Sequence, residues 1–593
     1  MKEARKCACT ALLVFMVVFL LSSSTLFMKG KKESNQAQHS LIWDMKSMIL
    51  RIIAESWFHG NRHVVVNTED KKPSHVVLSP NLTTCHPSFS DDNKPVYCCP
   101  PKRESEEPFI DFQFPDPSTQ SIRVRRPAHV MDKDKVFAAK YNKAIAIMKS
   151  LPYDDPRSFR RQADIHCIFC TGAYNQQHSN SLMKIHRSWM FFPWHRMMIY
   201  FHERILGSLV GDDTFALPFW NWDSPEGMHV PDMFLNGSFV DTERDSSHLP
   251  PQVVDVNFDE QERGLGYEEQ KAYNVGFMYT QMISAAKKPE LFMGCPYKAG
   301  GDGYCNSPGT VEDAPHNTLH YWMGSNLNPE RENMGAFYSA ARDPIFYSHH
   351  SNIDRLWEVW RELRSSNNVP EDSDWLETHF FFHNEKSQLV RVKIRDVLDV
   401  TKLRYTFDWV ENPWINARPK PSVPPHMARQ MLRMRNSNNH NGGLLLTTSD
   451  FGPMGRILDT ILRVQVQRPR THRTRKEIED EEEEEVLVVY GIDVKNDVYA
   501  KFDVYINAVD ENTISPTTRE FAGTFVNMRR GVKVVMNKDD IAVDKKSHIK
   551  LGISELLEDL EADEDESIWV SLVPKGNTGV SISIDGIRIE YLK

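Results

Sequence analysis

The arrangement of histidines in the middle of the chain constrains its fold more than any other feature. His316 and His320 are four residues apart in a segment that Pro315 can begin as a helix, so that both imidazoles lie on one helix face. His349 and His350 follow in a second segment of helical character. Two helices facing one point predict a buried metal site to which the second helix supplies the third imidazole.

A second cluster is formed by His166, His186 and His195. In one continuous helix His186 and His195 would lie on opposite faces, but Pro193 is expected to begin a new helix that carries His195. His186 is then left in the preceding loop. The three imidazoles are predicted to converge from a helix, a loop and a helix.

Two histidines four residues apart are weak evidence alone, because the chain has 23 histidines. His379 and His383 have the same spacing in a segment typical of a buried strand, and solvated or core histidines are the default for an isolated pair. Two complete triads nevertheless favour metal binding. Three neutral imidazoles per ion, without carboxylate or thiolate ligands, favour copper or zinc over magnesium, calcium or di-iron.

Four neighbouring residues are expected not to bind metal. Glu203 and Asp354 are predicted to support the ligands from outside by hydrogen bonds. His349 is interpreted as a non-ligand, and His202 as a packing or supporting residue.

The hydrophobic pattern divides the chain. Helical spacing dominates between about residues 130 and 409, which predicts a mainly helical core. Residues 412–485 are rich in Pro, Arg, Asn and Gly and end in the acidic run Glu477–Glu485, so we expect a linker open to proteases. Short alternating runs over 486–593 predict a separate C-terminal β domain, a sandwich or barrel-like fold.

The N-terminus is typical of a secretory signal peptide over residues 1–28. Lys2, Arg5 and Lys6 precede an apolar stretch, Ala11–Leu21, that is shorter than the roughly 20 residues of a membrane span. An uncleaved signal anchor is the alternative, and stable membrane association is expected only in that case. Residues 29–80 are interpreted as a propeptide or linker.

This reading predicts the vacuole lumen or the cell exterior and not the chloroplast thylakoid, since no transit signal is visible. The Asn-x-Ser/Thr sequons at Asn81 and Asn236 fit the same compartment. The net charge of −10 arises partly from the acidic run and gives no indication of a nucleic acid partner.

At the histidine segments the chain resembles the plant polyphenol oxidases, the catechol oxidase and tyrosinase family with type 3 copper centres. Residues 186–203 are similar to the family's first copper motif and residues 343–354 to its second. The resemblance runs from about Cys85 to the C-terminus and implies a catalytic domain over 81–411. It implies two copper ions, copper A on His166, His186 and His195, and copper B on His316, His320 and His350.

The resemblance also implies covalent links between side chains. Cys170 matches the cysteine that forms a thioether to His186. The family's disulfides correspond to Cys85–Cys99 and Cys98–Cys167. Cys295 and Cys305 lie outside that pattern, and we suggest that they pair.

Three further residues correspond to catalytic positions of the family. Phe337 matches the aromatic gate over copper A. Glu312 and Asn317 match the pair that orders a water near copper B, where a carboxylate and an amide could hold the water that takes a phenol proton. Helix capping is the structural alternative for that pair.

Asp408–Trp409 and Lys501–Val504 are similar to family signatures of the middle and C-terminal regions. The C-terminal domain is similar to the shield over the copper site of latent enzymes, and an activating protease is expected to cut the linker.

The implied activity is oxidation of small phenolic substrates, o-diphenols to o-quinones, with reduction of dioxygen to water. Monophenol hydroxylation is a further expected activity that the bulk of Tyr321 could hinder. Alternatives are a specialised aurone- or lignan-type biosynthetic oxidase and a haemocyanin-like dioxygen carrier without turnover. A purely structural zinc protein would not explain six histidines without cysteine ligands.

Overall fold

The computed structural model describes residues 77–89, 94–101, 107–261, 263–300, 303–364, 369–437, 445–470, 483–495, 498–511, 514–528, 546–576 and 578–593. All of them belong to one unit, His75–Lys593. The predicted signal segment 1–28 and nearly all of the predicted propeptide 29–80 lie outside the described residues, as does most of the acidic run. None of the helices in the described ranges is both long and apolar enough to span a membrane.

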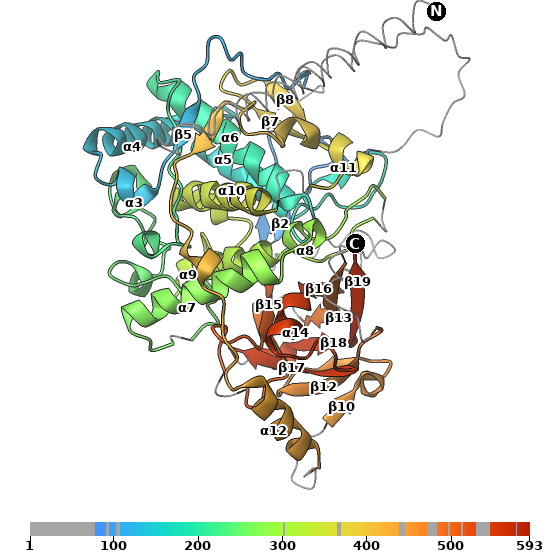
Figure 1. Cartoon of the computed structure of the whole chain (residues 1–593). Helices are drawn as coiled ribbons and strands as arrows, with labels where there is room; N and C mark the ends of the chain where they lie inside the picture. The colour runs from blue at the N-terminus through green and yellow to red at the C-terminus, as the bar shows by residue number, and fades with distance from the viewer. Residues whose placement is uncertain are drawn as a thin grey trace, which may run out of the picture. The chain divides into compact units, whose positions relative to one another are not determined.

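The N-terminal part of this unit is a helical core, as predicted (Figure 1). Its central helix α6 packs against both α4 and α10. The main helices of the core are α4 (Lys135–Ser150), α5 (Phe159–Cys170), α6 (Phe191–Val210), α7 (Tyr267–Tyr279), α9 (Asn317–Met323) and α10 (Ile345–Leu363).

Local sequence explains where these helices begin and end. The Ser158 side chain accepts a hydrogen bond from the Arg161 N–H and so caps α5. Pro193 lies in the first turn of α6, where its missing N–H costs no helical hydrogen bond. Gly211 ends α6 in the left-handed conformation with φ 68°. Because nearly every side chain of α6 is buried, this helix forms the centre of the core.

Small sheets line the core. Strand β5 (Arg123–Arg125) pairs in parallel with β9 (Tyr405–Phe407). A second sheet has the order β4 (Phe109–Asp111), β8 (Leu389–Lys393), β7 (His379–His383). The pair His379 and His383 therefore lies on a strand, as predicted, and the His383 ring contacts the Glu107 carboxylate at 3.1 Å.

The C-terminal β domain contains two five-stranded sheets with an apolar core of its own. One sheet has the order β10 (Leu445–Thr447), β12 (Leu462–Gln467), β17 (Ser567–Lys575), β14 (Ala500–Ile506), β15 (Phe521–Asn527). In the other, β11 (Arg456–Ile457), β18 (Ile582–Ile584), β13 (Glu484–Val494) and β16 (Ser547–Gly552) follow in order, and β19 (Gly586–Leu592) also pairs with β13. All residues of β14 and β15 are buried, and β15 also contacts the helical core.

The structure differs from the expected linker over 412–485. Strands β10, β11 and β12 lie within that range and belong to the β domain, and α12 (Pro425–Ser437) precedes them. The end of the acidic run is also structured, because Glu483–Glu485 are buried at the start of β13. Arg468 forms two 2.8 Å hydrogen bonds to Glu485, and this pairing compensates the buried charge. A run of like charges reads as solvent-exposed when partners distant in sequence are unknown.

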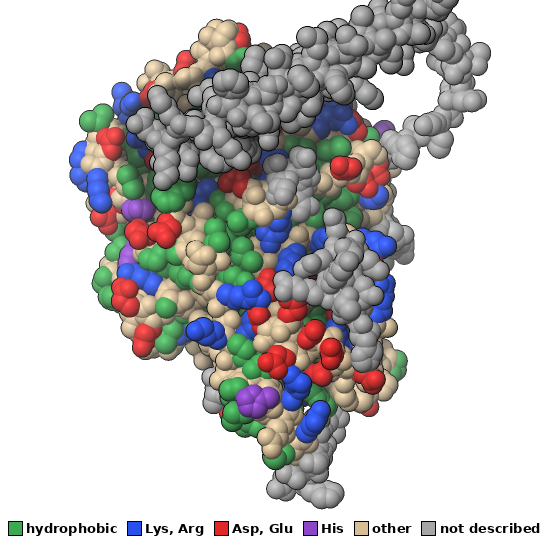
Figure 2. Space-filling model, in the orientation of Figure 1, with side chains coloured by type: hydrophobic (Ala, Val, Ile, Leu, Met, Phe, Trp, Pro, Cys, Tyr) green, Lys and Arg blue, Asp and Glu red, His purple; other side chains and the backbone are tan. Residues whose placement is uncertain are grey.

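Charged side chains of both signs are distributed over the surface. On the face drawn in Figure 2, acidic and basic side chains are interspersed over the helical core and the β domain.

Candidate metal centre

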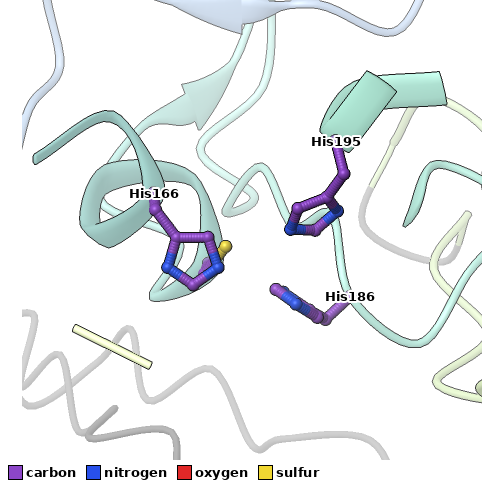
Figure 3. A group of neighbouring side chains, drawn as sticks. His166, His186 and His195 are labelled. Carbon is purple, nitrogen blue, oxygen red and sulfur yellow. The ribbon is translucent and has the colours of Figure 1, made fainter. Parts of the chain in front are cut away.

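Two groups of buried histidines come together in the helical core. His166 is on α5, His186 lies in the loop before α6 and His195 is in the second turn of α6, so the predicted helix, loop and helix arrangement is observed (Figure 3). Within each group the potential ligand atoms lie within 4.8 Å of one another. The first group is His166, Cys170, His186 and His195, and the second is His316, His320, His349 and His350.

The second group is carried by two helices, as predicted. Ala314 is extended, and Pro315 begins a helical turn that passes His316 and continues into α9 with His320. His349 and His350 are in the first two turns of α10.

The two groups face each other across one centre. The rings of His195 and His350 are nearly parallel, with centroids 4.3 Å apart. The rings of His186 and His316 are 5.8 Å apart. These separations place the groups close enough to hold two neighbouring metal ions.

Backbone carbonyls orient the imidazoles. Nδ1 of His166 is 3.0 Å from the Phe337 carbonyl oxygen, and Nδ1 of His195 is 2.8 Å from that of Phe191. His320 makes the same contact to the Met334 carbonyl at 2.9 Å. A carbonyl can only accept, so each Nδ1 carries the proton and each Nε2 carries the lone pair that a metal needs.

Four of the histidines have inward-facing nitrogens without a hydrogen-bond partner among the described residues. Nε2 of His166, His195 and His316 has no hydrogen-bond partner among the described residues, nor does either ring nitrogen of His186. Buried polar atoms of this kind are rare unless an ion or water completes them. The donor set fits copper, which imidazole nitrogens bind well.

The neighbouring residues His349 and His350 differ in their ring contacts. Trp222 Nε1–H donates a 3.1 Å hydrogen bond to Nδ1 of His349, which places the proton of the neutral ring on Nε2. His350 Nε2 instead lies 3.3 Å from His320 Nε2, and both atoms face the centre. This contact pattern supports His350, not His349, as the third ligand of the second group.

Burial keeps the imidazoles neutral. Desolvation lowers the pKa of His166, His186, His316 and His350 well below the usual value, and neighbouring imidazoles act in the same direction. It lowers the pKa of His195 to about 3 and that of His320 to about 4. Neutral imidazoles are the form that binds a metal ion.

The expectation that Glu203 and Asp354 hydrogen bond to the ligands is wrong. Glu203 accepts from Arg123 Nε at 2.9 Å and from Arg125 Nε at 2.8 Å. Asp354 accepts from Arg125 Nη1 at 2.9 Å and Arg196 Nε at 2.6 Å. Both carboxylates are buried, and they tie α6 and α10, the helices that carry His195 and His350, to strand β5.

The predicted water-binding pair lies beside the second group. Glu312 Oε1 accepts a 2.6 Å hydrogen bond from the Arg187 N–H, while Oε2 has no partner in the described part of the chain. Asn317 Oδ1 is 3.0 Å from His316 Nδ1. Burial raises the pKa of Glu312 well above its ordinary value, whereas a bound metal cation would act in the opposite direction.

The predicted gate and the cysteines are also placed. The Phe337 ring centroid lies 4.6 Å from that of His186. The disulfides Cys85–Cys99 and Cys98–Cys167 are present, and Cys295 pairs with Cys305 as suggested. Cys170 is buried and makes no disulfide.

His202 packs away from both groups. Its ring stacks on Tyr347 with centroids 3.5 Å apart, and burial lowers its pKa to about 3. The interpretation as a packing residue is confirmed.

Tyr499 of the β domain contacts a residue that neighbours the second histidine group. Tyr499 stacks on Tyr321, the residue after His320, with ring centroids 3.6 Å apart. The Tyr321 hydroxyl donates to Glu260, and the Arg331 guanidinium lies 4.1 Å from the Tyr321 ring centroid. The bulk of Tyr321 was visible in the sequence. Tyr499 could not be found there, because the two residues lie on opposite sides of the region expected to be a linker.

Asp313, which follows Glu312, contacts the β domain and is expected to make the stability of the fold depend on pH. Asp313 Oδ1 accepts a 3.1 Å hydrogen bond from the Val526 N–H, and burial raises its pKa from 3.8 to about 7, against the opposing charges of Arg187 and Lys501. The folded form then holds a proton that the unfolded chain releases above pH 4. The stabilising effect of this bound proton is complete below pH 4 and is lost as the pH rises to about 7.

The variant Asp313→Asn keeps the acceptor oxygen but cannot ionise. We expect its free energy of unfolding, relative to the parent protein, to rise by roughly 2–3 kcal/mol between pH 5 and pH 8. Urea unfolding of the copper-free proteins at both pH values measures this difference. An equal difference at both pH values would contradict the role of Asp313.

Three family models cover most of the unit. Residues 156–363 match the common central domain of tyrosinase, residues 370–420 the polyphenol oxidase middle domain, and residues 454–591 the chloroplastic polyphenol oxidase C-terminal domain. The last match begins within the region expected to be a linker, in agreement with the strands observed there.

Characterised proteins are similar over most of their length. Aureusidin synthase of Antirrhinum majus is 44% identical over 525 residues, 87% of this chain and 88% of that protein. The chloroplastic polyphenol oxidase of Malus domestica is 40% identical over 523 residues, 87% of this chain and 84% of that protein. The structure of latent apple tyrosinase superposes with a TM-score of 0.73 at 40% identity, covering 82% of this chain and all of the other.

These relatives overturn the expected secretory, vacuolar or extracellular location. The relative from Malus domestica and those from Vitis vinifera and Prunus armeniaca are chloroplastic, and so is the matching C-terminal family. The expectation rested on a basic segment followed by a short apolar one, a pattern too general to identify a compartment without further information.

The matches and the two imidazole groups agree on the cofactor. The tyrosinase central domain spans both groups, and each group offers buried nitrogen ligands suited to one ion of a copper pair. With relatives that align from the helical core through the β domain, the chain belongs to the plant polyphenol oxidase family of dicopper oxidoreductases.

Proposed function

We propose that this protein oxidises o-diphenols to o-quinones with dioxygen and that its β domain holds it latent until a protease cuts between the two parts. The observation that carries the proposal is the convergence of six buried, neutral imidazoles on one centre, four of which have an Nε2 atom with no hydrogen-bond partner among the described residues. We assign copper A to His166, His186 and His195, and copper B to His316, His320 and His350.

The chain's own residues orient the reaction. When bound, the copper pair supplies electron exchange between phenol and dioxygen. Two catechols lose two electrons and two protons each, which reduce one dioxygen to two waters. Glu312 Oε2 is unpartnered within the described residues and can take a proton from a phenol directly or through a water. The Phe337 ring beside His186 can orient an aromatic substrate over copper A.

Latency is supported by the contacts of the β domain. Tyr499 covers Tyr321 beside a copper B ligand, and β15 packs on the turn that carries Glu312. A catechol would have to displace these contacts to enter from that side.

The test is oxygen uptake by the copper-loaded protein with a simple catechol, before and after limited proteolysis between residues 423 and 444. Sustained uptake that rises after cleavage supports a latent oxidase. Uptake that stops at one dioxygen per copper pair in both samples would favour the haemocyanin-like carrier. Replacing catechol by a monophenol then separates tyrosinase from catechol oxidase activity.

A specialised biosynthetic oxidase is the second candidate, favoured by the 44% identity to aureusidin synthase. The same assay with a chalcone distinguishes it. A much higher kcat/KM for the chalcone than for catechol would support it, and equal values would not.

The thioether between Cys170 and His186 gives a covalent prediction. The Cys170 sulfur lies within 4.8 Å of the ligand atoms of the first group and is not in a disulfide. We expect a cross-linked pair of peptides in digests of the copper-loaded protein, with two hydrogens fewer than the separate peptides, because dioxygen accepts the two electrons and two protons that the thiol and the imidazole C–H lose. Peptide mass spectrometry should find this pair in the parent protein and not in Cys170→Ser. A Cys170 that alkylates fully after denaturation would contradict the link.

A further inference from the structure

Arg187 directly follows the copper A ligand His186 and reaches into the β domain. Its side chain is buried, although it starts from the loop before α6. Its backbone has φ 61°, a left-handed conformation that costs energy for a residue with a side chain and persists only where surrounding contacts hold it.

The main chain of Arg187 ties the loop that carries His186 to Glu312 and Ser307. Its N–H donates the 2.6 Å hydrogen bond to Glu312 Oε1. Its carbonyl accepts from the Ser307 N–H at 3.0 Å, and the Cys295–Cys305 disulfide closes the segment just before Ser307. One peptide unit thus fixes the carboxylate beside copper B and follows the loop ligand of copper A.

The side chain of Arg187 binds the β domain at three points. Nη1 donates to Ser547 Oγ at 2.8 Å, and Nη2 donates to Asn527 Oδ1 at 2.9 Å and to the Val526 carbonyl at 3.2 Å. Ser547 Oγ donates in turn to the Asn306 carbonyl at 2.8 Å. Asn306 precedes Ser307, so the main chain of Arg187 and its partner Ser547 both bind the segment 306–307. Hydrogen bonds from a buried guanidinium are among the stronger contacts in proteins.

We propose that Arg187 is a positioning residue through which the docked β domain fixes the loop of His186 and the carboxylate of Glu312. The inference rests on the proposed function, of which it is a regulatory part. The β domain then does more than cover the centre, because its release also frees the backbone that holds one copper A ligand and the proton acceptor. Docking is therefore coupled to the geometry of the loop in addition to the proposed steric exclusion.

The physical reason is that a single residue makes both the backbone contact to Glu312 and the side-chain contacts to the β domain. The guanidinium and the N–H that binds Glu312 belong to the same residue, so only the buried side-chain torsions of Arg187 lie between them, and the left-handed backbone restricts the ways in which the loop can relax. A shift of the docked side chain that its packed torsions do not absorb must be taken up by the backbone φ and ψ angles of Arg187 and its neighbours.

The test is hydrogen–deuterium exchange of the peptides that cover 185–190 in the full-length, copper-loaded protein. The double variant Asn527→Ala/Ser547→Ala removes two docking partners without changing any residue of the helical core. We expect exchange in this loop to become at least about tenfold faster, since the lost charge-assisted bonds restrain it. Arg187→Lys, which keeps the charge but not the forked donors, should act in the same direction and decides the question if the double variant does not fold.

Glu290→Gln is the matched control. Lys550, on the same strand as Ser547, donates a 2.7 Å hydrogen bond to Glu290 of the core, so this variant weakens another contact between the two parts. Exchange over 185–190 should stay at the parent rate. Unchanged exchange in the docking variants, or an equal increase in Glu290→Gln, would overturn the proposal.

Exchange does not depend on turnover. A protein that shows the predicted exchange but never oxidises catechol would refute the proposed function and leave the coupling intact. Catechol oxidation with unchanged loop exchange would do the reverse.

Discussion

The variant His350→Ala is expected to bind one copper ion per chain instead of two and to lose oxygen uptake by at least about 100-fold. Supporting residues outside a metal's own ligands cost roughly 10–100-fold when changed, and the loss of a ligand should cost more. His350 projects from α10 with Nε2 facing that of His320 at 3.3 Å, so its removal opens copper B and leaves the first group intact. Copper analysis and oxygen uptake with catechol measure both effects.

His349→Gln is the matched control one residue earlier. The glutamine oxygen can still accept the hydrogen bond that Trp222 Nε1 donates to His349. This variant should keep both copper ions and activity within a few-fold of the parent. If His349→Gln loses copper while His350→Ala retains it, the ligand assignment in the second group is reversed.

A second large effect is expected at Asp354, one helical turn after His350. Asp354→Ala should lower the free energy of unfolding of the helical core by roughly 3–5 kcal/mol, because it leaves buried charges partly uncompensated. The donors that lose their acceptor are Arg125, Arg196 and the Tyr405 hydroxyl. Copper B content should also fall, since α10 is no longer tied to β5 and α6.

Chemical denaturation of the copper-free protein measures the stability change at Asp354. Asp111→Ala is the control, because Asp111 also accepts from an arginine, Arg391, at 2.7 Å but is largely exposed. Exposed pairs of this kind contribute roughly 0–1 kcal/mol. Similar losses in the two variants would show that burial of the network around Asp354 is unimportant.

The grouping of the histidines could be predicted from sequence because it depends on local geometry. Pro193 separates His186 from the helix of His195, and the spacing of His316 and His320 fixes one helix face. The helical core and the β domain were predictable from the period of their apolar residues. Each of these inferences uses residues that are close in the chain.

The partners of buried charges could not be predicted in the same way. Glu203 and Asp354 were expected to face the histidines, but arginines from strand β5 bind them. Arg187 is part of a copper motif, yet its side chain binds Ser547 and Asn527 in another domain. Such pairings depend on which elements meet in the fold, and no spacing within one segment encodes that.

The position of β12 has a consequence for how the protein can be activated. This strand lies before the acidic run, yet it pairs along its whole length with β17 near the C-terminus. A cut in 471–482 would therefore leave a chain in two covalent pieces that share one sheet, with β12 of the first piece still paired with β17 of the second. A nick at that site would be visible on a denaturing gel but silent in a native one, and dissociation would require cleavage before β10.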